Sequence, residues 1–213
     1  MPLQNRVTPE GEIVAVTARG TMLGNRGGCF HRDDQTLRAR PFASRQWICC
    51  VLQFKGRRRP LRQPGLYTEL FFLDEATAMA AGHRPCFECR REEAERFAVL
   101  WNQLRDKPGR AAAPDMDAEL QEERIDSGYA KVVSRGTLGS LSDGAFVRRT
   151  EGPALLWGGQ LWPWSFAGYG APLRAPADKL VDVLTPPSIV AILAAGFRPR
   201  VHETLNAAGG TRP

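Results

Sequence analysis

The chain has 213 residues, 43% of them hydrophobic, which suffices for one large domain or for a medium domain followed by a small one. No run approaches about 18 apolar residues, and the N-terminus lacks a basic stretch followed by an apolar one, so we expect a cytoplasmic protein without a membrane span or a secretory signal. The net charge of +6 is uneven: residues 1–110 carry 19 Lys and Arg against 12 Asp and Glu, and residues 111–213 carry 10 against 11. A basic half favours an anionic partner, most often nucleic acid.

Period-2 alternation and turn residues predict three strands in the first half, at 12–18, 46–54 and 66–73. A glycine-rich turn at 20–28 follows the first of them, and a basic loop at 55–65 is expected to join the other two as a β-hairpin. Asp74 is the expected N-cap of a short helix that stops at Gly82. The residues after Cys89 predict an amphipathic helix, because their apolar side chains recur at helical spacing.

Composition divides the chain into a basic domain, a linker with a short helix, a small β-rich domain and a disordered tail, at 1–110, 111–135, 136–205 and 206–213. Within the β-rich part, the glycine pair at 158–159 predicts a tight hairpin turn. A strand is expected over 179–186, and a helix that begins near Pro187 is expected to close the unit. Helices and strands segregated in this way predict an α+β fold.

The chain holds five cysteines, an odd count with a CxxC pair that favours metal or redox chemistry over disulfides. Cys86 and Cys89 precede the amphipathic helix, where the helix N-terminus stabilises thiolate charge and the spacing lets both sulfurs face one ion. A structural zinc needs four ligands. Cys29 and His31 supply a candidate pair, because residues i and i+2 of an extended segment share a face. We therefore predict a Zn²⁺ site of Cys29, His31, Cys86 and Cys89 that stabilises the N-terminal domain.

Three alternatives stay open at this point. Cys49 or Cys50 could replace Cys29 as a ligand, although a cysteine on a strand is more often a buried apolar residue. A redox CxxC would be expected in a thioredoxin-like βαβ context, which the sequence lacks. His31, Asp33 and Asp34 could hold Mg²⁺ in a metal-dependent nuclease, although a turn with solvated aspartates is the favoured interpretation.

The segment 71–91, FFLDEATAMAAGHRPCFECRR, resembles the N-terminal metal-binding domain of Ada-type DNA-repair proteins. In that family an aromatic-rich strand leads to a short Ala-rich helix, to A-A-G-F-R-P-C-x-x-C and to a further helix, and residues 80–89 match this phrase with His83 in place of Phe. The resemblance implies a zinc site, association with nucleic acid, and a cysteine that accepts a methyl group from a DNA phosphotriester. The first ligand pair departs from the family, because C-x-H at 29–31 stands where the family has C-x3-C. An imidazole ligand would make the site a poorer nucleophile.

Basic side chains gather before and within the loop at 55–65, where they can lie along phosphates with Phe42 and Trp47 available for base stacking. The alternative is a solvated loop that discourages edge aggregation. The predicted nucleic-acid-binding residues are Arg38, Arg40, Arg45, Lys55, Arg57, Arg58, Arg59 and Arg62.

The sequence as a whole predicts a zinc-binding protein that contacts nucleic acid, DNA in the first place, in DNA repair or processing. One alternative is a metal-dependent nuclease or an alkyl-transfer enzyme. Another is a protein-interaction module that binds a partner protein through the Trp-rich C-terminal half. No membrane partner is expected.

Overall fold

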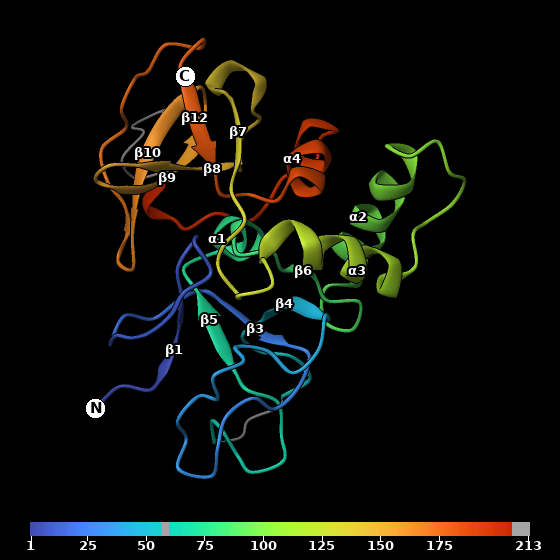
Figure 1. Ribbon diagram of the computed structural model, residues 1–213, viewed down its shortest axis with the longest axis vertical. Coiled ribbons are helices and arrows are strands. Elements are labelled where there is room, and N and C mark those ends of the chain that lie inside the picture. Colours follow the sequence, from blue (N-terminus) through green and yellow to red (C-terminus); the bar gives the residue numbers. More distant parts are fainter. Residues whose placement is uncertain (57–59, 206–213) are drawn as a thin grey trace.

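The computed structural model describes residues 1–56 and 60–205, and within these ranges the chain forms two six-stranded sheets and four α-helices. The predicted α+β class is confirmed. Figure 1 shows the sheet of the first half and the sheet of the second half at opposite ends of the molecule, with helices between and beside them. The predicted tail at 206–213 lies outside the described residues.

The first sheet has the order β2-β1-β5-β3-β4-β6, with β1 (Gln4–Val7), β2 (Ile13–Ala15), β3 (Met22–Arg26), β4 (Trp47–Val51), β5 (Leu70–Phe72) and β6 (Arg84–Pro85). Strand β3 pairs antiparallel with both β4 and β5 and lies between them. The prediction that the strands at 46–54 and 66–73 pair with each other is therefore wrong, and β4 forms its hairpin with β3. Gly24 permits this arrangement, because a Cβ there would lie 2.4 Å from the Ile48 carbonyl oxygen and 2.8 Å from the Phe72 ring.

The second sheet has the order β11-β10-β9-β8-β12-β7, with β7 (Ser134–Thr137), β8 (Phe146–Arg149), β9 (Gly152–Trp157), β10 (Gln160–Ser165), β11 (Gly168–Tyr169) and β12 (Leu180–Val183). A short 3₁₀ turn (Leu138–Ser140) follows β7. The predicted glycine turn is confirmed: Gly158 and Gly159 join β9 to β10 with φ values of 58° and 70°. Two successive positive φ values suit the right-handed twist of a tight hairpin, and glycine adopts them without steric cost.

The four helices are α1 (Glu75–Ala80), α2 (Arg91–Gln103), α3 (Ala113–Arg124) and α4 (Pro187–Ala194). The predicted N-cap of α1 is confirmed, because the Asp74 carboxylate accepts a hydrogen bond of 2.9 Å from the Thr77 N–H. Gly82, with φ of 85°, follows the end of this helix. Among the described residues, none of the helices has the length and apolar character that a bilayer crossing requires.

Helices from both halves share one apolar core. Its buried side chains come from all four helices and include Met79, Phe97, Trp101, Met116, Leu120, Ile189 and Ile192. Helix α3, inside the predicted linker, packs here against α2 and α4. The aromatic side chains of the second half also turn inward, since Trp162, Tyr169 and Phe146 are buried in a second cluster against α1. This packing fixes the segment between α1 and α2, which carries the CxxC pair.

Candidate metal centre

Three cysteines meet at the edge of the first sheet. The sulfurs of Cys50, Cys86 and Cys89 all lie within 4.8 Å of one another. Among the described residues, they form the one group of three or more side chains that could hold a metal ion together. Cys86 is buried, and the other two side chains are partly exposed. Zn–S bonds of about 2.3 Å in a tetrahedron place sulfurs about 3.8 Å apart. The cluster is therefore close to the spacing that a single ion requires.

Parallel pairing of two short strands brings Cys50 to the CxxC segment. Strand β6 pairs with β4 so that Cys49 lies beside Pro85, and the Cys86 N–H donates to the Cys49 carbonyl at 3.0 Å. One residue further along both strands, Cys50 lies beside Cys86. Successive side chains of a strand point to opposite faces. Cys49 is accordingly buried in the apolar core with Phe72, as expected for a strand cysteine, whereas Cys50 faces the cluster.

A tight turn brings Cys89 back to Cys86. The Arg90 N–H donates to the Cys86 carbonyl at 3.0 Å, and the Glu88 N–H points at the Cys86 sulfur at 3.4 Å. Hydrogen bonds from the Cys50 and Cys89 thiols lower the pKa of Cys86, and donation to Cys86 raises the pKa of Cys50. These hydrogen bonds stabilise the thiolate form of Cys86, which is the form that binds a metal cation.

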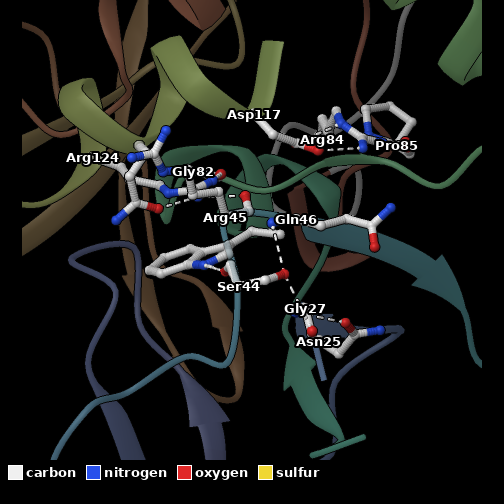
Figure 2. A network of polar contacts seen from close by, with 12 residues as sticks. Asn25, Gly27, Ser44, Arg45, Gln46, Gly82, Arg84, Pro85, Asp117 and Arg124 are labelled. Atoms are coloured by element: carbon white, nitrogen blue, oxygen red, sulfur yellow. Dashed lines mark hydrogen bonds and ion pairs between the residues drawn. The ribbon is translucent and has the colours of Figure 1, made fainter. Parts of the chain in front are cut away.

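Two buried ion pairs hold this segment from both sides. The Arg84 guanidinium makes two hydrogen bonds of 2.8 Å to the Asp117 carboxylate of α3, shown in Figure 2. Arg90 makes a similar forked contact to Glu75 of α1, with 2.8 Å between Nη2 and Oε2. Forked arginine–carboxylate pairs fix geometry as well as charge. The CxxC turn is therefore anchored to two helices of the shared core.

Cys29 and His31 lie together but do not belong to the three-cysteine cluster. The Cys29 sulfur is 3.8 Å from Nδ1 of His31, and that nitrogen lies 2.8 Å from the Thr68 hydroxyl oxygen. The sheet register explains the separation: Cys50 faces Leu23 in β3, whereas Cys29 follows the opposite end of that strand. The structure thus brings Cys50, rather than the predicted Cys29 and His31, to Cys86 and Cys89.

Three further side chains of ligand type have local partners. His83 is buried against aromatic rings, with Nδ1 3.2 Å from the Ala78 carbonyl oxygen, and its burial lowers its pKa well below the usual value. Asp34 accepts hydrogen bonds from the Thr36 N–H and hydroxyl, which is the geometry of an exposed turn. His202 lies beside the Thr204 hydroxyl in the second half. These contacts account for Asp34 and for one nitrogen each of His202 and His83, whereas the buried Nε2 of His83 has no hydrogen-bond partner among the described residues.

The predicted nucleic-acid-binding residues fall into three groups. Arg38, Arg40, Arg45 and Lys55 are exposed. Arg57, Arg58 and Arg59 lie outside the described residues. Arg62 is only 2% exposed, and its guanidinium donates to the backbone carbonyls of Gln35 and Gln4, so it stabilises the loop internally.

The two aromatic residues that were expected to stack on bases are both buried. Phe42 is 5% exposed and Trp47 is 1% exposed. The guanidinium carbons of Arg26 and Arg124 lie 3.9 and 4.0 Å from the centre of the Trp47 ring. The stacking prediction is therefore wrong for Trp47, whose ring already contacts two cations inside the protein.

Comparison of the chain with protein-family models, with curated proteins and with solved structures finds no match. A functional interpretation must therefore start from the site itself. The two best-defined features of the structure are the three clustered thiols and the exposed basic residues on the same half of the chain.

Proposed function

We propose that this protein binds Zn²⁺ through Cys50, Cys86 and Cys89 and contacts nucleic acid through the basic residues of its first half, in DNA repair or processing. The observation that carries the proposal is the meeting of three sulfurs from two separate segments within 4.8 Å. Soft thiolate ligands favour zinc over the hard cations that prefer oxygen. The resemblance of residues 71–91 to the metal-binding domain of Ada-type proteins supports the same assignment.

The metal part is tested by the zinc content of the purified protein. We expect about one zinc per chain in the wild type and a large loss in the Cys50→Ser and Cys89→Ser variants. Cys49→Ala is the matched control, because that side chain occupies the same strand but faces the core. Cys29→Ser tests the ligand predicted from sequence. Full zinc in Cys50→Ser together with a loss in Cys29→Ser would contradict the proposed ligand set.

The nucleic-acid part rests on charge. Arg38, Arg40 and Lys55 are exposed on the half of the chain that carries the excess of positive charge. Each phosphate contact steepens the salt dependence of duplex binding by about 0.9 in the log–log slope. We therefore expect binding to short DNA at low salt, and a flatter slope in the double variant Arg38→Ala/Arg40→Ala. The double variant Arg174→Ala/Lys179→Ala removes equal charge from the second half and should bind as the wild type does. Absence of binding by the wild type at low salt would refute this part.

Alkyl transfer is a second candidate, favoured by the donor set. The sequence pattern placed an imidazole among the ligands, whereas the clustered donors are three sulfurs. Three thiolates leave more negative charge on a zinc complex than a set with histidine, and zinc-bound thiolates with an open fourth position can act as nucleophiles. The sulfur would form the new S–CH₃ bond while the O–CH₃ bond of a methyl phosphotriester breaks, and the electron pair would stay on the phosphate oxygen.

Intact-mass measurement after incubation with methyl-phosphotriester DNA tests this candidate. Transfer would add about 14 Da, because CH₃ replaces H. Cys50 and Cys89 are the candidate acceptors, because Cys86 is buried. An unchanged mass in zinc-loaded protein that binds the same DNA would exclude transfer while leaving the binding function intact.

A further inference from the structure

A second site lies on the other side of β4 from the cysteines. A pocket of about 910 Å³ opens between the first sheet, the loop at 32–41 and the segment after α3. Six cationic side chains line it: Arg26, Arg32, Arg38, Arg124, Lys131 and Arg148. The carboxylates in the lining are Glu10 and Glu12, and Glu10 already pairs with Arg148 at 3.2 Å. The lining therefore carries a large excess of positive charge.

The innermost charges bond only to neutral acceptors among the described residues. Arg26, 2% exposed, donates to the Gly11 carbonyl at 2.8 Å. Arg124, with no exposed surface, donates to the carbonyls of Gly82 at 3.0 Å and Arg45 at 2.6 Å, as Figure 2 shows. In both side chains Nε is buried and has no hydrogen-bond partner within residues 1–56 and 60–205. Buried arginines are normally paired with an acid. Here the described residues supply none within ion-pair distance.

These cations also lie close to one another. Both guanidiniums pack on the ring of Trp47, whose π-electrons offset part of their charge. The Lys131 ammonium donates to the Ala80 carbonyl and faces the same two arginines. Burial and this mutual repulsion lower the pKa of Lys131 to about 7 and that of Arg124 to about 8. The folded protein therefore maintains a positive potential that a bound anion would relieve.

We propose that this pocket binds a phosphate group, carried by a mononucleotide or by the end of a nucleic acid strand. Arg26, Arg124 and Lys131 supply the potential at its floor, and Arg38, exposed at its mouth, supplies a guanidinium fork that matches phosphate oxygens. The volume lies in the range of small-molecule sites, and the half-exposed ring of Tyr129 offers a face for a base. The nucleic-acid source rests on the proposed function, whereas the affinity for phosphate does not.

The test uses the full chain and four probes: inorganic phosphate, a mononucleotide, and a short single-stranded oligonucleotide with and without a 5′-phosphate. Calorimetric titration at pH 6, below the pKa of about 7 at which Lys131 loses its proton, should show binding of the phosphate-bearing probes. It should show binding about tenfold weaker in Arg38→Gln and in Lys131→Met, since each removes a charged contact. Arg174→Gln, which removes an exposed charge outside the pocket, is the control. Both pocket variants keep the buried arginines in place, so a folding failure is not expected to obscure the result.

The outcomes separate the two sources. Tighter binding of the 5′-phosphorylated oligonucleotide than of the unphosphorylated one, lost in the pocket variants, assigns the site to a strand end. Binding of the mononucleotide without any binding of either oligonucleotide supports the pocket and refutes the nucleic-acid part of the proposed function. Absence of binding of every phosphate-bearing probe, or equal binding by wild type and both pocket variants, overturns the inference.

Discussion

The cysteine cluster and the cationic pocket are built on the same strand and gather opposite charges. Cys50 belongs to the cysteine cluster, and Trp47, three residues earlier in β4, lines the cationic pocket. The segment around the cysteines is held by arginine–carboxylate pairs, whereas the arginines around Trp47 bond to carbonyl oxygens. Ion pairs therefore anchor the first site, whereas the second keeps an excess of positive charge. A cation is the expected ligand of one and an anion that of the other.

The largest expected effect is loss of the metal. Removal of the proposed zinc by a chelator, or the Cys89→Ser substitution, should lower the free energy of unfolding by about 4–5 kcal/mol, because an ion held by Cys50, Cys86 and Cys89 would join β4 to the start of α2. Denaturant titration with and without zinc measures it. Cys49→Ala should cost about 1 kcal/mol through lost packing and leave the response to chelator unchanged. Equal stability with and without zinc would contradict a structural role for the ion.

The second-largest loss of stability is expected when the ion pair between Arg84 and Asp117 is broken. Asp117→Ala leaves the Arg84 guanidinium buried without a carboxylate and should cost about 3–5 kcal/mol. The double variant Arg84→Met/Asp117→Leu removes both charges and should recover most of that loss. Thermal and urea unfolding of the three proteins measures the difference. If the Asp117→Ala protein were as stable as the wild type, the Arg84–Asp117 ion pair would not be what holds the cysteine segment in place.

The smallest effect concerns pH and the cationic pocket. Burial beside Arg26 and Arg124 lowers the pKa of Lys131 from 10.5 to about 7. Between these values the unfolded chain binds a proton that the folded chain lacks, so this group makes the free energy of unfolding rise with pH, by at most about 1.4 kcal/mol per pH unit. Unfolding in phosphate-free buffer from pH 7 to 9 should show the rise. It should be reduced in Lys131→Met and retained in the surface control Lys179→Met, and an equal rise in all three would contradict the assignment.

Local pattern predicted the four helices and about half of the strands, but it predicted a turn at 20–28, where β3 lies, and it did not predict how the strands pair. Alternation and capping residues located α1 and the β9–β10 turn, because both depend on neighbours in sequence. The insertion of β3 between β4 and β5 depends on contacts across more than twenty residues and on the close approach that Gly24 allows. Local periodicity carries no information about that choice.

The cysteine cluster and the cationic pocket also differ in how far the local sequence predicts them. The CxxC spacing identified Cys86 and Cys89 as candidate metal ligands from the sequence. The alternation of side chains along β4 would also have distinguished Cys50 from the buried Cys49. The cationic pocket joins Arg26 to Arg124 across almost a hundred residues, and no motif surrounds either one. Only the tertiary fold brings both of them onto one tryptophan ring.

X-ray absorption at the zinc edge of the purified protein tests the central claim most directly. Three sulfur neighbours at about 2.3 Å, with one lighter atom completing the shell, are the predicted result. A protein without zinc, or a shell of two sulfurs with an imidazole whose signal disappears in His31→Ala, would contradict it.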